Sequence, residues 1–286
     1  MSQSMHSQTI VITGASTGIG RACALHLDKL GFQVIAGVRT ETDATSLQHA
    51  SSDRLTTVHI DIAESDSILR ATNIIETQLK SVGLYGLINN AGIVIAGPLE
   101  FVPIDALRSQ LEINVVGHIA ITQALLPLLR QAKGRIINMS SVSGRVATPF
   151  LGPYAASKFA LEALSDSMRL ELMPWGINVS VIEPGPIATP IWSKSIEATK
   201  LMIDKLPEKA KVLYGPAFEA ALRRENNIEQ SMSTPEVVVR AVVHALTSRK
   251  PRIRYRIGLS GFAADIFARF LPDVLKDWLI KRQRKI

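Results

Sequence analysis

Cysteine is nearly absent from the 286-residue sequence. Cys23 is the one example, so no disulfide can form within the chain and nothing points to secretion. The N-terminal residues, MSQSMHSQ, are polar, so we expect no signal peptide. No uninterrupted apolar run reaches about 18 residues, so we expect no membrane-spanning helix. These absences predict a cytoplasmic protein.

Clustered metal ligands and repeated segments are also missing. The six histidines do not group with cysteine or acidic residues at ligand spacing, so no metal site is predicted. No internal repeat, low-complexity tract or linker interrupts a chain that is 47% hydrophobic. This length and composition suit an enzyme-sized core built as one large α/β domain or two small ones.

The body of the chain has no excess charge of either sign. Residues 250–286 contain ten Lys/Arg and three Asp/Glu, and the rest of the chain holds 22 basic and 22 acidic residues. The net charge of +7 therefore lies in the C-terminal segment. A neutral body is not the pattern of a nucleic-acid-binding surface, so we predict no nucleic-acid partner.

Strand and helix patterns alternate along the sequence. Apolar runs predict strands at residues 9–13, 33–38, 55–60, 84–88, immediately before Ser141, at 178–183 and at 252–257. Helical patterns lie between most of them, which implies parallel βαβ crossovers. We therefore predict an α/β fold: a single Rossmann-type domain over residues 1–258, with a doubly wound parallel sheet of about seven strands and helices on both faces.

A glycine-rich turn follows the first predicted strand at once. It reads Gly14-Ala15-Ser16-Thr17-Gly18-Ile19-Gly20 and leads into a helical run that stops at Gly31. Glycine permits the tight turn and the close approach of a pyrophosphate, and the helix N-terminus faces the anion. A strand, a glycine-rich turn and a helix in this order predict a dinucleotide-binding unit.

The end of the second predicted strand lacks an acidic residue. In a dinucleotide-binding fold an acid at this point binds the ribose 2′-hydroxyl, whereas a cation binds a 2′-phosphate. Here Val38 and Arg39 occupy the position, so we predict a preference for NADP(H), with NAD(H) as the alternative. Two alternatives stay open: Arg39 is only a solvated loop residue, or Glu41 and Asp43 turn toward the ribose and favour NAD(H).

Several predicted strands end in polar residues. In doubly wound sheets, ligands bind outside the carboxyl ends of the strands. The glycine-rich turn, Arg39, Asp61, Asn90 and Ser141 all fall at such ends. Because these segments are independent of one another, their agreement predicts one site along this edge of the sheet.

Tyr154 and Lys158 lie four residues apart in a run with helical periodicity, so they share a face of the helix. A nearby cation favours the phenolate and lowers the tyrosine pKa from about 10 toward the working range. A hydroxyl at Ser141, after a buried strand, can hydrogen-bond a carbonyl or alkoxide oxygen. The alternative is an ordinary helix with a surface Tyr and Lys.

Three regions carry further interpretations. Asn114 lies on the apolar stripe of a helix expected over about residues 105–130, as a satisfied core amide or as a site residue. A less regular region at about residues 190–230 is a candidate substrate lid. Residues 259–286 form a basic amphipathic tail that either binds a membrane surface or packs on its own domain or on a second subunit.

The motifs resemble the short-chain dehydrogenase/reductase family over about residues 9–258. They are Thr13-Gly14-x-x-x-Gly18-x-Gly20, Asn89-Asn90-Ala91-Gly92, Asn114, Ser141, Tyr154-x-x-x-Lys158 and Pro184-Gly185-x-x-x-Thr189, in the family's order and spacing. GLYGLINNAGI, SDSMRLEL, VIEPG and the RYRIG segment, together with the basic tail, are similar to the retinol and hydroxysteroid dehydrogenase branch. Thr17 departs from the family, since many NADP-binding members carry a basic residue there.

The resemblance implies roles for residues at matching positions. Tyr154 would be the acid-base residue, Lys158 would lower its pKa and hold the nicotinamide ribose, and Ser141 would orient the substrate oxygen. Asn114 would hold a water that links Lys158 to solvent. The implied cofactor-binding set is Gly14, Ser16, Thr17, Gly18, Ile19, Gly20, Arg39, Asp61, Ile62, Asn90, Ala91, Gly92, Tyr154, Lys158, Pro184, Gly185, Ile187 and Thr189. Within that set, Asp61 would meet the adenine edge, Asn90 the adenosine side, and Ile187 with Thr189 the carboxamide.

The implied activity is NAD(P)-dependent hydride transfer to or from a lipophilic alcohol or carbonyl, such as a retinoid or a steroid. The alternative is a cofactor-binding regulatory protein that keeps the fold without turnover, which the intact Asn-Ser-Tyr-Lys set disfavours. The family also implies a homodimer or a homotetramer. A cytoplasmic placement and a membrane-associated one, through peripheral contact of the tail, both stay open.

Overall fold

The computed structural model of the chain describes residues 8–191, 197, 207–229, 232–258, 266–267 and 270–284. Seven strands form one parallel sheet with the order β3-β2-β1-β4-β5-β6-β7. The strands are β1 (Thr9–Ile12), β2 (Gln33–Val38), β3 (Leu55–His59), β4 (Gly86–Asn89), β5 (Arg135–Met139), β6 (Asn178–Pro184) and β7 (Arg254–Ile257). The predicted doubly wound α/β fold is confirmed, with each strand within about two residues of its expected bounds.

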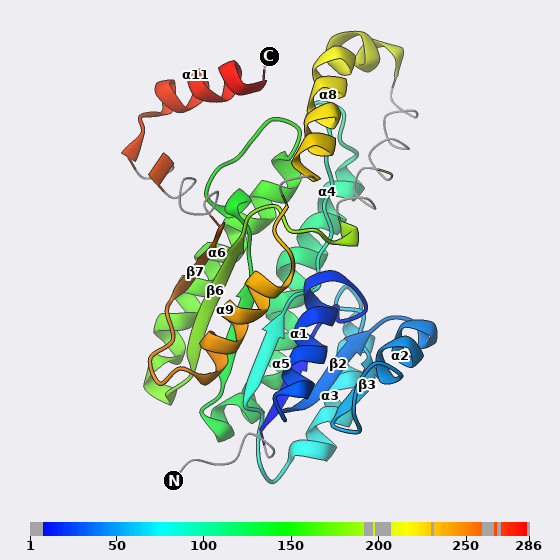
Figure 1. Ribbon diagram of the computed structural model, residues 1–286, viewed down its shortest axis with the longest axis vertical. Helices are drawn as coiled ribbons and strands as arrows, with labels where there is room; N and C mark the ends of the chain where they lie inside the picture. The colour runs from blue at the N-terminus through cyan, green and yellow to red at the C-terminus, as the bar shows by residue number, and fades with distance from the viewer. Residues whose placement is uncertain are drawn as a thin grey trace.

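Helices cover both faces of the sheet (Figure 1). Helices α1 (Gly18–Lys29), α2 (Glu41–Gln48) and α9 (Glu236–Thr247) bury apolar side chains in one core, which includes Cys23. Helices α3 (Ser65–Leu79), α5 (Gly117–Ala132) and α6 (Gly152–Leu172) contribute to a second core on the opposite face. Burying one face of each amphipathic helix against the sheet gives the two hydrophobic layers that stabilise the domain.

The helix expected at about residues 105–130 is interrupted. It consists of α4 (Ile104–Leu111), a π-helical turn η2 (Glu112–Val116) and α5, and Asn114 lies inside the π turn. A π turn inserts an extra residue into the helix and changes the direction of its side chains, and such turns are frequent at functional sites. The continuous segment Ile104–Ala132 is long and apolar enough to cross a membrane, but it lies against α3, α6 and β4 as a core helix of the domain.

The candidate lid region is more regular than its sequence suggests. Helix α8 covers Glu208–Glu229, so the expectation of an irregular segment is wrong for these residues, although Pro216 lies within the helix. Two edge-to-face aromatic contacts hold α8: Tyr214 against Phe101, and Phe218 against Phe150. Trp192, Met202 and Leu206 belong to the same candidate lid region by sequence and lie outside the described residues.

Two short 3-10 turns and one further helix complete the described elements: η3 (Val142–Gly144) before α6, η4 (Met173–Trp175) after it, and α11 (Asp273–Arg284) in the tail. Figure 1 shows α11 in red, outside the sheet and its covering helices. Within the predicted tail, Phe262 and Lys285 are among the residues that lie outside the described part of the chain.

Candidate active site

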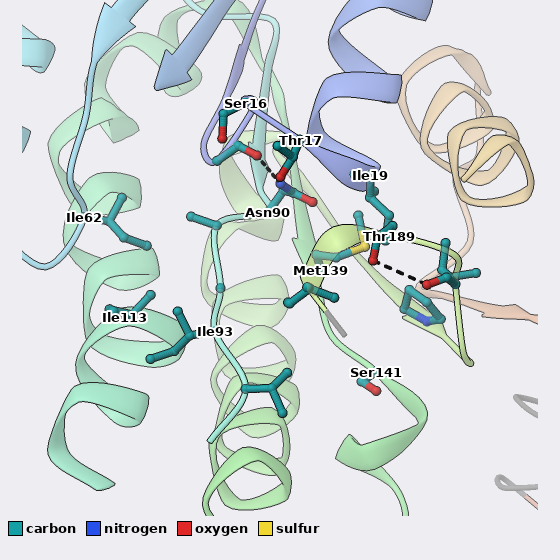
Figure 2. Close-up of a pocket in the computed structure, with 18 of the residues that line it drawn as sticks. Ser16, Thr17, Ile19, Ile62, Asn90, Ile93, Ile113, Met139, Ser141 and Thr189 are labelled. Atoms are coloured by element: carbon teal, nitrogen blue, oxygen red, sulfur yellow. Dashed lines mark hydrogen bonds between the residues drawn. The ribbon is translucent and has the colours of Figure 1, made fainter. Parts of the chain in front are cut away.

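A cavity of about 460 Å³ runs along the carboxyl ends of the strands, where the chain order reverses between β1 and β4. In an open α/β sheet, this reversal leaves a crevice for a ligand. Figure 2 shows the lining residues converging from the β1, β4, β5 and β6 ends. The predicted site residues that line the cavity are Gly14, Ser16, Thr17, Gly18, Ile19, Arg39, Asp61, Ile62, Asn90, Ala91, Gly92, Ser141, Tyr154, Lys158, Pro184, Gly185, Ile187 and Thr189.

The glycine-rich turn is built for close approach. Gly14 has φ +65°, and a β-carbon there would lie 2.7 Å from the Cα of Ala91. Glycine alone adopts this backbone conformation at no cost and leaves this space open. Helix α1 then begins at Gly18, and no side chain caps its first turn. Its free backbone N–H groups and the positive end of its dipole therefore favour an anion such as a pyrophosphate.

Asn90 fastens this turn to the end of β4. Its side-chain amide donates hydrogen bonds of 3.0 Å to the carbonyls of Thr13 and Gly14. In return, the Thr13 hydroxyl accepts from the backbone N–H groups of Asn90 and Ala91 at 3.0 and 3.1 Å. Asn90 lines the cavity and also holds the turn in shape.

The far end of the cavity is the end of β2. The Arg39 guanidinium lies 3.9 Å from the Asp61 carboxylate, and the Arg39 side chain is 66% exposed. Neither Glu41 nor Asp43 is among the lining residues. Asp43 instead accepts a hydrogen bond from the Thr40 hydroxyl at 2.7 Å, while its backbone N–H donates to Thr40 at the start of α2. The one cation lining this end among the described residues is therefore Arg39.

The opposite end contains Ser141, Tyr154 and Lys158. Ser141 caps η3, and its hydroxyl accepts from the Ser143 N–H at 3.1 Å. The Lys158 ammonium lies 5.6 Å from the centre of the Tyr154 ring and donates to the Met139 carbonyl at 2.8 Å. Tyr154 is 8% exposed and Lys158 is 4% exposed. The alternative of a surface Tyr and Lys on an ordinary helix is therefore wrong.

The pKa shifts at this end differ from the expectation. Burial raises the pKa of Tyr154 above its ordinary value, and a hydrogen bond from Ser141 opposes that rise. Burial also lowers the pKa of Lys158 to about 8, although the nearby Glu162 carboxylate raises it. Burial therefore sets the direction of the shift in the phenol pKa, opposite to the lowering that was expected from the neighbouring cation. A protonated phenol beside a largely charged lysine at neutral pH can donate a proton to a carbonyl oxygen.

Two predicted residues do not line the cavity. Gly20 lies behind the turn, where a β-carbon would clash with the Gly14 carbonyl oxygen. Asn114 is fully buried; its side-chain oxygen accepts from the Ile93 N–H at 2.9 Å, and its amide donates to the Ile93 carbonyl and to Ser157. Its side chain is satisfied by protein groups, and it fixes the cavity wall at Ile93 against α6.

The loop after β6 closes the cavity beside the glycine-rich turn. Its backbone forms an isolated bridge to Ser233, through Ala188 N–H to the Ser233 carbonyl at 2.9 Å and Ser233 N–H to the Pro186 carbonyl at 3.1 Å. A β-carbon at Gly18 would lie 3.1 Å from the Thr189 side chain, so loop and turn are in close contact.

Sequence reasoning missed the apolar part of the lining. The additional lining residues are Gly37, Val38, Ile60, Ile93, Val94, Ile95, Ile113, Met139, Ser140 and Ile191. Most of them lie within a few residues of a predicted site residue, so extending each strand end by a few positions would have found them. Ile113 follows no strand end, and its one signal was its neighbour Asn114 in the π turn.

The cavity fits a dinucleotide: it has an anion-binding turn near its middle, a cation at one end and a Ser-Tyr-Lys group at the other. Comparisons with known proteins agree with this class. The sequence profile described as short chain dehydrogenase matches residues 8–200. The chain is 40% identical to retinol dehydrogenase 5 of Mus musculus, over 96% of this chain and 89% of that protein. It is 37% identical to 17-beta-hydroxysteroid dehydrogenase type 6 of Bos taurus, over 97% of this chain and 89% of that protein.

Solved structures show the same fold. A short-chain dehydrogenase from Burkholderia cenocepacia, crystallised in complex with NADP, superposes with a TM-score of 0.72 at 24% identity, covering 99% of this chain and 100% of that one. The chain belongs to the short-chain dehydrogenase family, within its retinol and hydroxysteroid dehydrogenase branch. It is accordingly an NAD(P)-dependent oxidoreductase that acts on alcohol or carbonyl groups.

Proposed function

We propose that the protein transfers a hydride between NADP(H) and a lipophilic alcohol or carbonyl of the retinoid or steroid class, with Tyr154 as the acid-base residue. The observation that carries this proposal is the joining of Ser141, Tyr154 and Lys158 to the dinucleotide turn in one cavity. The apolar lining at Ile93, Ile95 and other residues suits a hydrocarbon substrate. The names of the two relatives described above support the same substrate class.

Each residue at the reacting end then has a task. The nicotinamide, when bound, supplies or accepts the hydride. Tyr154 donates a proton to the substrate oxygen in reduction and removes it in oxidation. Ser141 donates a hydrogen bond to the same oxygen, and the Lys158 charge favours the phenolate as the proton leaves. Asn114 acts through the protein, by holding Ile93 and Ser157 in position, and its implied bond to a water stays a prediction.

The test of this function is a panel of retinoids, steroids and aliphatic ketones, assayed with NADPH and NADH by nicotinamide absorbance. We expect turnover with at least one retinoid or steroid carbonyl and with the corresponding alcohol in the reverse direction. Tight cofactor binding without turnover across the panel would instead support the regulatory protein. Turnover of the aliphatic ketones alone would contradict the assigned substrate class.

The NADP(H) preference rests on Arg39. Its guanidinium lines the adenosine end, Asp43 is engaged with Thr40, and Thr17 supplies no second cation. The Arg39 guanidinium can form a charge-assisted pair with a 2′-phosphate. The phosphate would compete for it with the Asp61 carboxylate, which lies 3.9 Å away. We expect Arg39→Ala to lower the ratio of kcat/KM for NADPH to that for NADH by roughly ten- to a hundredfold.

The control for Arg39 is Arg21→Ala. Arg21 is a cation in α1 whose guanidinium donates to the Ser46 carbonyl in α2, and it does not line the cavity. Its loss should leave the cofactor ratio unchanged. A wild-type preference for NADH, or an unchanged ratio in Arg39→Ala, would show that Arg39 is only a surface residue.

The tail is proposed to contact anionic membrane surfaces. Among the described residues, Phe270, Val274 and Trp278 are 76%, 83% and 51% exposed, and Lys281 and Arg282 follow on α11. Exposed apolar side chains beside basic ones are typical of interfacial helices. Such contact would place the protein at a membrane surface while the domain stays in the cytoplasm. The alternative is that the tail packs on a second subunit or elsewhere on its own domain.

Liposome flotation distinguishes these alternatives. We expect the full-length chain to float with anionic vesicles, and neither the chain truncated after residue 260 nor full-length protein with zwitterionic vesicles to do so. The electrostatic part should weaken at high salt. Equal behaviour of the two chains on anionic vesicles would dismiss membrane binding by the tail.

We also propose that the protein is a homodimer or a homotetramer. Exposed apolar side chains on and beside α6, at Phe159, Leu164, Leu170 and Trp175, support a subunit interface there. Light scattering on the purified protein measures the mass directly, and a monomer at all accessible concentrations would contradict the proposal.

A further inference from the structure

A cluster of charged side chains lies behind the reacting end of the cavity and does not line it. It consists of Arg145, Glu162, Glu183 and Arg254, here called the buried charge cluster. The Glu162 and Glu183 side chains are 6% and 1% exposed. Charges so deeply buried are costly unless they are paired and hydrogen-bonded, so their arrangement calls for a physical reason.

The pairing is dense. The Arg145 guanidinium donates to Glu183 at 2.7 and 3.0 Å and to Glu162 at 3.2 Å. Arg254 donates to Glu162 at 3.0 Å and lies 3.3 Å from Glu183. Two arginines thus bridge two carboxylates, and short contacts of this kind are among the stronger hydrogen bonds in proteins.

The cluster joins the segments that carry the reacting residues. Arg145 follows η3 and lies four residues after Ser141, whereas Glu162 belongs to α6 with Tyr154 and Lys158. Glu183 lies near the end of β6, just before the loop that closes the cavity beside the glycine-rich turn. One set of ion pairs therefore spans three independent walls of the site.

Packing between the first two walls is equally tight. A β-carbon at Gly144 would lie 2.9 Å from the Ser140 hydroxyl and 3.1 Å from the Glu162 side chain. The Ser140–Gly144 segment thus lies directly against the helical turn that holds Lys158 and Glu162. A small shift of Glu162 would move both the Ser141 hydroxyl and the α6 residues relative to the substrate oxygen, and such misplacement lowers rates strongly.

We propose that Glu162 is a positioning residue of this active site, which fixes the Ser141 segment against α6 and supplies the negative charge that keeps the Lys158 ammonium protonated. Glu162 lies one helical turn after Lys158 on the same face. The inference deepens the proposed function, because it rests on the roles given there to Tyr154 and Lys158.

The charges around the pair define the direction of the effect. Glu162 raises the pKa of Lys158 against the larger effect of burial, which leaves it at about 8. His118, on α5, faces the same lysine; burial and the lysine charge lower its pKa to about 3, so it is neutral at working pH. Burial raises the pKa of Glu162, and the neighbouring Glu183 carboxylate adds to that rise, whereas the Ser140 hydroxyl and the guanidinium groups of Arg145 and Arg254 oppose it.

Carbonyl reduction needs the protonated Tyr154-Lys158 pair, so the rate should fall as the pH rises through about 8. Loss of the Glu162 charge removes the carboxylate that raises the pKa of Lys158, so the pKa of the pair should fall. In the isosteric variant Glu162→Gln we expect the alkaline limb of kcat to move toward lower pH by about one unit. The KM of the carbonyl substrate should change little, and kcat at neutral pH should fall.

Two matched variants complete the experiment. Asp166→Asn removes a carboxylate from the same helix that also pairs with Arg254, but one turn further from Lys158 and 41% exposed, so the limb should stay in place. Glu162→Asp keeps the negative charge, so the alkaline limb of kcat in this variant should lie closer to its wild-type position than in Glu162→Gln. Melting temperatures of all variants identify any loss of folding, and the pH profiles are compared at a temperature at which every variant is folded.

An unchanged alkaline limb in folded Glu162→Gln, or an equal shift in Asp166→Asn, would overturn this role for Glu162. Those outcomes differ from failure of the proposed function. If Tyr154→Phe kept its activity, the acid-base assignment itself would be wrong, whereas an inactive Tyr154→Phe with an unmoved limb in Glu162→Gln rejects the inference about Glu162 alone.

Discussion

Replacement of Tyr154 by phenylalanine should reduce turnover by at least ~100-fold while cofactor binding stays close to that of the wild type. The phenylalanine ring keeps the packing of the buried side chain, which is only 8% exposed, and removes just the oxygen that carries the proton. Steady-state kinetics in both directions, together with a cofactor titration by fluorescence, measure the two quantities separately. The loss should appear in kcat more than in KM, because the interaction is made at the reacting oxygen.

Tyr85→Phe is the matched control for this prediction. Its hydroxyl donates to the Leu246 carbonyl at 2.6 Å, on an opposite part of the domain from the cavity end that holds Tyr154. Loss of that hydrogen bond should lower the free energy of unfolding by about 1 kcal/mol without changing turnover. If Tyr154→Phe retained activity within a few-fold of the wild type, the acid-base assignment would have to move to another residue.

Most of the fold could be predicted because its signals are local. The seven apolar runs each became a strand of one parallel sheet, and the alternation with helices fixed the parallel direction. What could not be predicted depends on tertiary contacts. Helix α8 contains Gly215 and Pro216, which weaken its local helical signal, and its aromatic contacts to Phe101 and Phe150 involve loops distant in sequence.

The site divides in the same way. Residues at strand ends, such as Arg39 and Ser141, were placed at the cavity by topology alone. Gly20 and Asn114 belong to the same family motifs but do not line the cavity. Gly20 packs against the Gly14 carbonyl within the glycine-rich turn, and Asn114 holds Ile93 in position. Sequence spacing predicts that residues share a site; it does not tell which side chain faces the ligand.

The pKa of Tyr154 illustrates a second limit. Spacing along a helix correctly predicted that Lys158 lies near the phenol, at 5.6 Å from its ring. The sign of the net shift depends on how deeply both groups are buried, and burial is a property of the whole fold. Desolvation raises the pKa of the phenol and lowers that of the lysine. The pKa values of the two groups therefore diverge.

Lys158→Ala should damage both turnover and cofactor binding, in contrast to Tyr154→Phe. Its ammonium serves the phenol electrostatically and, by the proposed function, also holds the nicotinamide ribose. We expect kcat to fall by at least ~100-fold and cofactor affinity to fall about tenfold, since a charge-assisted hydrogen bond is worth roughly 1.5–3 kcal/mol. The same kinetics and fluorescence titration measure both losses.

Lys158→Met separates charge from packing, because it keeps an unbranched side chain of similar length. Both variants leave the Met139 carbonyl without its 2.8 Å donor, so both should lose about 1–3 kcal/mol of stability, but only the alanine variant also leaves a cavity. If charge is what matters, Lys158→Met should be as inactive as Lys158→Ala while melting at a higher temperature. Normal cofactor affinity in both variants would remove Lys158 from cofactor binding and leave it with the phenol alone.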